Sequence, residues 1–201
     1  MPNISKKGAQ MPESPIRKLV PFAEKAKKSG IEVLHLNIGQ PDIAPPLNVI
    51  RKINNFGIKS LQYSHSAGLE DYRKKLATYY QKIESNISYN DILITTGGSE
   101  ALNTIINCIC DPDDEIIIPD PYYANYNGFT NSCSVNIEPI LCDIEKNFQL
   151  PDISQFEAKI SKKTKAILIC NPGNPTGALY SLSELKSLAK IVKKHDLFLK
   201  L

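Results

Sequence analysis

Short apolar runs typical of β-strands alternate with helical patterns over the second half of this 201-residue chain, and this alternation constrains the fold more than any other feature. Helical patterns begin at Ser99 and Tyr122 and cover 152–160, and Ser181 with Glu184 has the spacing of a capping box. The predicted strands are DILITT (91–96), EIIIP (115–119), SVNIEPI (134–140), KAILIC (165–170) and LFLKL (197–201). This order predicts an α/β fold with a three-layer, doubly wound and mostly parallel sheet.

The first 45 residues are rich in Pro, Lys and Gly, and we interpret them as an arm and a connector. They include a short amphipathic stretch at 15–28. Pro45 and Pro46 then precede a helical pattern, where proline fits because a first-turn N–H would have no intrahelical acceptor. Residues 69–83 place apolar side chains on one helical stripe, which predicts a further helix.

Composition excludes several classes of function. The 24 basic and 21 acidic residues are spread along the chain, so we expect no nucleic-acid partner. Because no apolar stretch approaches the roughly 20 residues of a membrane span and the N-terminus lacks a secretory core, we expect no membrane association and a cytoplasmic location. The five cysteines are expected to be reduced thiols. Histidines and carboxylates do not cluster, so we expect no metal site.

The segment DILITTGGSEAL (91–102) runs from a predicted strand through two glycines into a helix. The first N–H groups of that helix have no intrahelical acceptor and converge on one point, which attracts an anion. The pattern matches neither the dinucleotide fingerprint nor the P-loop, so it indicates only a phosphate or a carboxylate. A plain turn capped by Ser99 is an equally good interpretation.

Two other segments follow predicted strands. In NPGNPTG (171–177), prolines on both sides of Asn174 hold an amide that can donate to a phenolate or carbonyl oxygen. A structural turn explains the same spacing. In PDPYYANY (119–126), Tyr122, Tyr123 and Tyr126 offer an aromatic face for a planar ring, or simple core packing.

Taken in order, five segments resemble the class I/II aminotransferases, pyridoxal-phosphate enzymes of fold type I, and specifically an aspartate-aminotransferase-like branch. They are LNIGQPD (36–42), YSHSAG (63–68), TTGGSEAL (95–102), DEIIIPDPYYANY (114–126) and TKAILICNPGNPTG (164–177). The resemblance implies a transferase that uses pyridoxal 5′-phosphate to move an amino group from an amino acid to a 2-oxo acid. It also implies a homodimer, an arm and small-domain segment at 1–45, and an incomplete cofactor-binding large domain at 46–201.

The resemblance assigns the phosphate and the substrate carboxylate to particular residues. By that resemblance, Gly39 approaches the substrate carboxylate with its backbone. Gly98, Ser99 and Glu100 supply the loop and helix N-terminus under the cofactor phosphate. Tyr63 resembles the residue that reaches the phosphate of the neighbouring subunit.

The resemblance also places the cofactor ring, with Tyr123 at the position that stacks on the pyridine and Asn174 at the position that bonds the phenolic oxygen. One anion cradle, one aromatic platform and one amide donor suit a flat phosphorylated pyridine. Gly173 and Asp113 depart from the family, which often has Asn and Gly there.

The largest departure is at the end of the sequence. The family continues this strand into Asp-Glu-x-Tyr and later supplies the Schiff-base lysine and a carboxylate-binding arginine, whereas this sequence reads Lys200, Leu201 and stops. We therefore expect a fold truncated before its last strands, no catalytic lysine and no activity of the chain alone. The alternatives are a non-catalytic remnant or partner that pairs with a full-length or complementary chain, and a lyase on the same fold.

Overall fold

The computed structural model describes residues 2–60, 62–84 and 86–200, and its contacts divide the chain into two compact units. The first unit comprises Met1–Phe22 and Ser99–Leu201, and the second comprises Ala23–Gly98. The division expected from the resemblance, into an arm and small-domain segment at 1–45 and an incomplete cofactor-binding large domain at 46–201, stays a prediction.

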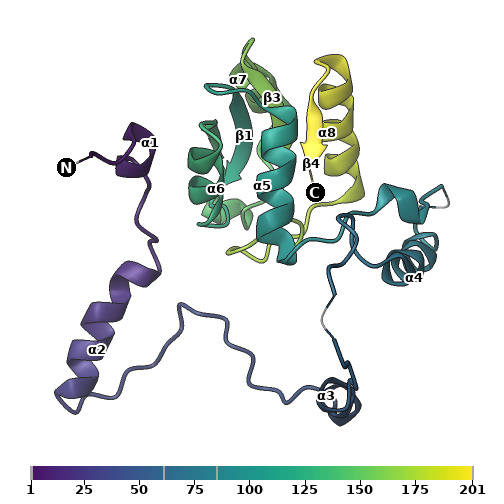
Figure 1. Cartoon of the computed structure of the whole chain (residues 1–201). Helices are drawn as coiled ribbons and strands as arrows, with labels where there is room; N and C mark the ends of the chain where they lie inside the picture. Colours follow the sequence, from purple (N-terminus) through teal and green to yellow (C-terminus); the bar gives the residue numbers. More distant parts are fainter. Residues whose placement is uncertain (1, 61, 85, 201) are drawn as a thin grey trace. The chain divides into compact units, whose positions relative to one another are not determined.

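A parallel sheet of four strands forms the centre of the first unit (Figure 1). The strands follow the order β2-β1-β3-β4, and every neighbouring pair is parallel. Their bounds are β1 (Glu115–Asp120), β2 (Asn136–Leu141), β3 (Thr164–Leu168) and β4 (Phe198–Lys200). The predicted α/β fold with a parallel sheet is confirmed.

Helices cover both faces of this sheet. Successive strand residues point to opposite sides, so apolar side chains of the strands lie on both faces and pack against helices there. Ile117 and Ile167 pack in one cluster with Phe156 and Leu188, whereas Ile116 belongs to the cluster on the other face. Buried side chains of this size contribute about 1.5–3 kcal/mol each. The covering helices are α5 (Gly97–Ile109) and α6 (Tyr126–Ser132) on one face, and α7 (Ile153–Lys159) and α8 (Leu182–Lys194) on the other.

The predicted capping box at the start of α8 is confirmed. The Ser181 hydroxyl accepts a hydrogen bond from the Glu184 N–H at 3.3 Å, and the Glu184 carboxylate accepts one from the Ser181 N–H at 2.7 Å. Two orphan donors are thereby satisfied, which fixes where the helix begins.

The predicted strand at 91–96 is wrong. After the short 3₁₀ helix η2 (Tyr89–Asp91), Ile92 has an extended backbone, but residues 92–95 pair with no strand in the described part of the chain. A strand needs a neighbour to accept its hydrogen bonds, and here the Ile94 N–H donates instead to the Ala67 carbonyl at 3.0 Å. Leu201, included in the predicted strand 197–201, lies outside the described residues.

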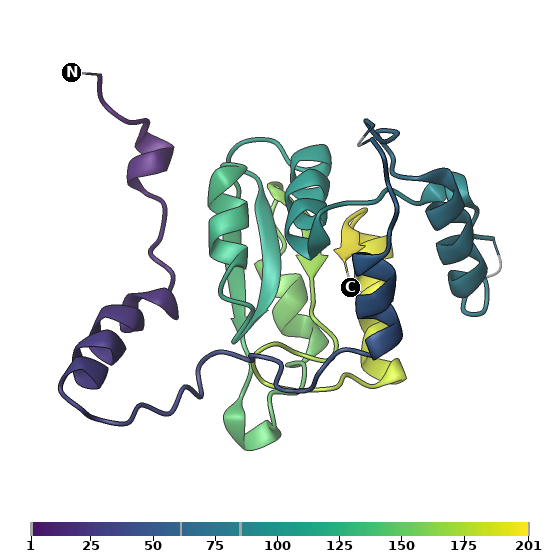
Figure 2. The same cartoon turned by 60° about the horizontal axis from the view of Figure 1, so that its bottom comes forward.

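The second unit contains α3 (Leu47–Asn54) and α4 (Glu70–Tyr80), which Figure 2 shows as separate helices. The helix predicted at 47–53 is therefore present, with its apolar residues exposed. The remaining described helices are α1 (Lys6–Ala9), η1 (Arg17–Leu19), α2 (Val20–Lys28) and η3 (Ile144–Lys146). Among the described residues, no helix combines the length and apolarity that crossing a membrane requires.

Candidate functional site

Three of the predicted segments meet at the carboxyl edge of the sheet. Tyr123 and Asn174 follow β1 and β3, and these strands are parallel, so both residues leave the sheet at the same edge. Helix α5 leads directly into β1 and packs against the sheet, so it runs opposite to β1 and begins at that edge (Figure 1). Ser99 and Glu100 in its first turn therefore lie at the edge that carries Tyr123 and Asn174.

The loop after β3 is held by its own hydrogen bonds. The Asn171 side chain accepts from the Tyr180 N–H at 2.9 Å, and the Gly173 N–H donates to the Ala178 carbonyl at 2.7 Å. A Cβ at Gly173 would lie 2.6 Å from the Thr176 hydroxyl oxygen, so this chain's departure from the family's Asn matches its own loop packing. Asn174 is therefore carried on a closed loop rather than on a free segment.

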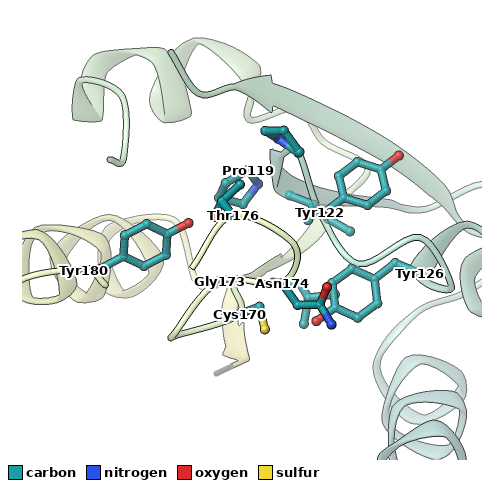
Figure 3. A pocket seen from close by; sticks show the side chains of 11 residues that line it. Pro119, Tyr122, Tyr126, Cys170, Gly173, Asn174, Thr176 and Tyr180 are labelled. Carbon is teal, nitrogen blue, oxygen red and sulfur yellow. The ribbon is translucent and has the colours of Figure 1, made fainter. Parts of the chain in front are cut away.

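A narrow cavity lies beside Asn174, and Figure 3 shows the side chains that surround it. Its volume is about 10 Å³, room for about one water molecule and not for a pyridine ring. A flat cofactor would therefore have to lie outside this cavity. The labelled lining residues are Pro119, Tyr122, Tyr126, Cys170, Gly173, Asn174, Thr176 and Tyr180.

Tyr123, the predicted stacking residue, does not line this cavity but contacts Tyr126, which does. Its ring meets that of Tyr126 edge to face, with centroids 5.5 Å apart and planes at 87°. Tyr126 is 7% exposed and lines the cavity with Asn174. Tyr126 therefore contacts Tyr123, the predicted aromatic platform, and lines the same cavity as Asn174, the predicted amide donor. The aromatic face expected from PDPYYANY included Tyr126, but nothing in the sequence distinguished its role from that of Tyr123.

The buried tyrosines of the cavity are neutral at ordinary pH. Burial raises the pKa of Tyr126 to about 12, with a contribution from its contact with Cys170. Burial likewise raises the pKa of Tyr180 to about 12 and that of Tyr122 above its usual value. Their protonated hydroxyls are hydrogen-bond donors, and that of Tyr122 donates to the Asn127 Oδ1 at 3.0 Å.

The start of α5 leaves room for an anion. Gly97 has φ +75°, and a Cβ at either Gly97 or Gly98 would meet no atom within 4 Å. The Thr95 hydroxyl donates to the Gly97 carbonyl at 3.0 Å, which fixes the turn before the helix. Open space beside first-turn N–H groups is the shape that a phosphate group requires, so Gly98, Ser99 and Glu100 fit the predicted phosphate cradle.

Gly39 and Tyr63 belong to the second unit. A Cβ at Gly39 would meet no atom within 4 Å, and the Tyr63 side chain is fully exposed. Both are thus accessible, and their assigned roles stay predictions.

Lysines are absent from the described lining of the cavity. Lys165 lies near the amino end of β3, the opposite edge, where it contacts Asp114 at 3.8 Å. Lys159 and Lys194 pair with Glu138 and Glu157 at 3.5 and 2.7 Å. The assignment of no catalytic lysine to this chain stays a prediction.

Comparison with known proteins identifies the family. The model "Aminotransferase class I and II" matches residues 31–200. An aspartate aminotransferase of Bacillus subtilis is 31% identical over 181 residues, which are 88% of this chain and 45% of that protein. The chain spans about half the length of the curated relatives it matches. Enzymes of this family generally use pyridoxal phosphate.

Solved structures agree with the sequence relatives. An alanine aminotransferase from Pyrococcus furiosus superposes with a TM-score of 0.90 at 32% identity, covering 98% of this chain and 51% of that one. An aspartate aminotransferase from Thermus thermophilus gives 0.89 at 27% identity, covering 99% and 52%. The fold-type prediction is confirmed by these neighbours, and the chain belongs to the class I and II aminotransferase family.

Proposed function

We propose that this chain supplies the cofactor-holding part of a pyridoxal-phosphate-dependent aminotransferase site. The observation that supports it most directly is that Ser99 and Glu100 in the first turn of α5, Tyr123 and Asn174 all lie at the carboxyl edge of the sheet in the first unit. The open space at Gly98 adds room for a phosphate. The family match over residues 31–200 supports the same function.

Each residue has a distinct role in this proposal. The N–H groups around Gly98, Ser99 and Glu100 bind the phosphate, because a helix N-terminus favours negative charge. The Tyr123 ring lies against the pyridine face, with Tyr126 fixing its edge, and the Asn174 amide donates to the phenolic oxygen. When bound, the cofactor supplies an electron-withdrawing ring that stabilises negative charge at the substrate α-carbon.

Two roles belong to the second unit. Gly39 lets a substrate carboxylate approach its backbone, and Tyr63 reaches the phosphate of a neighbouring subunit in a homodimer. The exposure of Tyr63 supports this role. The substrates are an amino acid and a 2-oxo acid, with aspartate the first to test because an aspartate aminotransferase is among the relatives.

We further propose that the chain alone does not catalyse amino-group transfer. An amine is needed to carry the cofactor and to move the proton at the α-carbon, and Lys165, near the amino end of β3, lies at the opposite edge of the sheet from Asn174. Activity then depends on a second polypeptide that provides this amine. The second candidate function is such a partner role, in which this chain pairs with a full-length or complementary aminotransferase chain; the family match over residues 31–200 supports it.

The experiment is equilibrium dialysis of the 201-residue chain with pyridoxal 5′-phosphate and with unphosphorylated pyridoxal. We expect tighter binding of the phosphate ester, and weaker binding of both compounds by Asn174→Ala. The matched control is Asn136→Ala. Asn136 is exposed and begins β2, so it lies at the edge of the sheet opposite to Asn174. Equal binding by the parent and Asn174→Ala would contradict the assigned role of Asn174.

The activity proposal has its own assay. The chain with pyridoxal 5′-phosphate, aspartate and 2-oxoglutarate is expected to give no turnover. Addition of a polypeptide corresponding to the second half of a relative is expected to produce turnover. Turnover by the chain alone would refute the proposed dependence on a partner.

A further inference from the structure

Arg73 on α4 is buried, which is rare for an arginine without a charged partner. The residue is 6% exposed, and none of the ion pairs among the described residues includes it. Its Nε donates to the Gly68 carbonyl at 3.2 Å, and its Nη1 donates to the Tyr89 carbonyl at 3.0 Å. The guanidinium also lies 5.4 Å from the centre of the Tyr89 ring. The side chain therefore joins two segments that are 21 positions apart in sequence.

The first of these segments is the loop that carries Tyr63. Near its end, the His65 ring Nδ1 accepts from the Ala67 N–H at 3.1 Å, and the Gly68 N–H donates to the His65 carbonyl at 2.8 Å. Gly68 has φ +92°, a conformation that favours glycine. This tight turn presents its Gly68 carbonyl to Arg73.

The second segment runs from Tyr89 into the turn at Gly97. The Ile94 N–H donates to the Ala67 carbonyl at 3.0 Å, and a Cβ at Gly68 would lie 2.5 Å from the Cβ of Ile94. The Gly68 backbone therefore lies against the Ile94 side chain, where only glycine fits. Arg73 and this close contact hold the same loop from two sides.

We propose that Arg73 is a positioning residue that fixes the Tyr63–Gly68 loop against the Tyr89–Thr95 segment. Through this clamp it orders the loop that carries Tyr63 and the segment that leads into the turn at Gly97–Gly98, to which the proposed function assigns phosphate contacts. The inference rests on the proposed function and adds a residue that touches neither cofactor nor substrate. Arginine suits the position because its planar fork reaches two carbonyls at once, which a lysine ammonium does less well.

The competing explanation is that Arg73 only stabilises the unit. Lys74 provides the matched control, because its Nζ lies 5.3 Å from the same Tyr89 ring yet the side chain is exposed and pairs with Glu70. Arg73→Met and Lys74→Met each remove a cation from near the Tyr89 ring. Only Arg73→Met also removes the hydrogen bonds to the Gly68 and Tyr89 carbonyls. Gly68→Ala breaks the clamp from its other side.

The first measurement is amide hydrogen exchange, followed by mass spectrometry of peptides covering 63–68 and 89–98. In Arg73→Met we expect exchange in both peptides to rise together by about tenfold, because buried hydrogen bonds to a charged group are lost. Lys74→Met should match the parent, Gly68→Ala should resemble Arg73→Met, and Arg73→Lys should lie between. Unchanged exchange in Arg73→Met would overturn the clamp.

The second measurement separates positioning from stability. The ratio of the dissociation constants for pyridoxal and pyridoxal 5′-phosphate reports the phosphate contribution alone, and we expect Arg73→Met to lower it about tenfold. A ratio in Arg73→Lys that lies between those of Arg73→Met and the parent would support a positioning role for Arg73. A preserved ratio in folded Arg73→Met would refute this inference while leaving the proposed function intact. A parent chain without phosphate preference would refute the proposed function, and with it the functional role of Arg73, even if exchange confirmed the clamp.

Should Arg73→Met fail to fold by circular dichroism, Arg73→Lys and Gly68→Ala carry both measurements. Arg73→Lys keeps a cation at position 73 and Gly68→Ala keeps Arg73 itself, and we expect a lowered phosphate ratio in each. Parent-like ratios in these two variants would overturn the inference.

Discussion

The two buried tyrosines of the cavity predict a loss of stability at alkaline pH. Tyr126 and Tyr180 are 7% and 8% exposed, and burial raises the pKa of each to about 12 from 10.0. Their neutral forms are favoured in the folded state, so the stabilisation is complete below pH 10 and is lost as pH rises through 12. Replacing both with Phe removes this pH dependence.

The size of the effect follows from the shifts. One pKa unit corresponds to about 1.4 kcal/mol, so each tyrosine should remove about 2–3 kcal/mol of folding free energy over the whole range. At pH 11, midway between the two pKa values, the loss is about 1.4 kcal/mol for each residue. This is a large share of the roughly 5–15 kcal/mol that stabilises a typical domain.

The assay is urea unfolding followed by circular dichroism at pH 9, 10 and 11. The parent should lose about 3 kcal/mol more than Tyr126→Phe/Tyr180→Phe between pH 9 and 11. Cys142, whose pKa is raised to about 11 by burial, contributes a loss of its own in both proteins. Tyr79→Phe, at an exposed tyrosine, is the control and should follow the parent.

Parallel unfolding curves for the parent and the double variant at all three pH values would refute the reasoning. So would a spectroscopic titration in which all nine tyrosines of the folded chain ionise together near pH 10. Either result would mean that water reaches the Tyr126 and Tyr180 hydroxyls, contrary to the burial of both side chains.

Three further predictions concern single positions. Ser181→Ala removes the cap of α8 and should lower the free energy of unfolding in urea by about 1 kcal/mol, whereas no change would mean the capping box contributes nothing. Phe156→Ala, at a fully buried side chain, should cost about 3–5 kcal/mol in the same assay, and a cost below that of the cap would argue against the core packing. A thiol reagent at neutral pH should label exposed Cys108 before buried Cys142, whose pKa is raised to about 11, and the reverse order in mass spectrometry would contradict the assigned burial.

Patterns that depend on local chemistry were readable from the sequence. The Ser181–Glu184 spacing marks the start of a helix because both partners lie within one turn. Apolar runs mark β1 and β3 because a strand covered on both faces needs apolar side chains on both. The carboxyl edge of the sheet, and hence the site, follows from their parallel order.

Properties that depend on a distant partner were not readable. Residues 91–96 have the composition of a strand, but pairing requires a neighbour that the local sequence does not specify. The connection from Tyr123 through Tyr126 to Asn174 depends on how α6 is oriented after β1, which the run of three tyrosines leaves open. The buried position of Arg73 likewise depends on the Gly68 and Tyr89 carbonyls, which come from segments on either side of α4 in the sequence.

The first unit is built from two stretches of chain, Met1–Phe22 and Ser99–Leu201, separated by 23–98. Docking the leading stretch closes a long loop at an entropic cost of about 4 kcal/mol. Two hydrogen bonds oppose this cost, from Lys7 Nζ to the Ser132 carbonyl at 2.8 Å and from Asn131 Nδ2 to the Gln10 carbonyl at 3.4 Å. Each contributes about 1 kcal/mol, and the Asn131 Oδ1 is buried there without a partner among the described residues. The leading stretch should therefore order last and detach first, and a protease should trim it while the sheet survives.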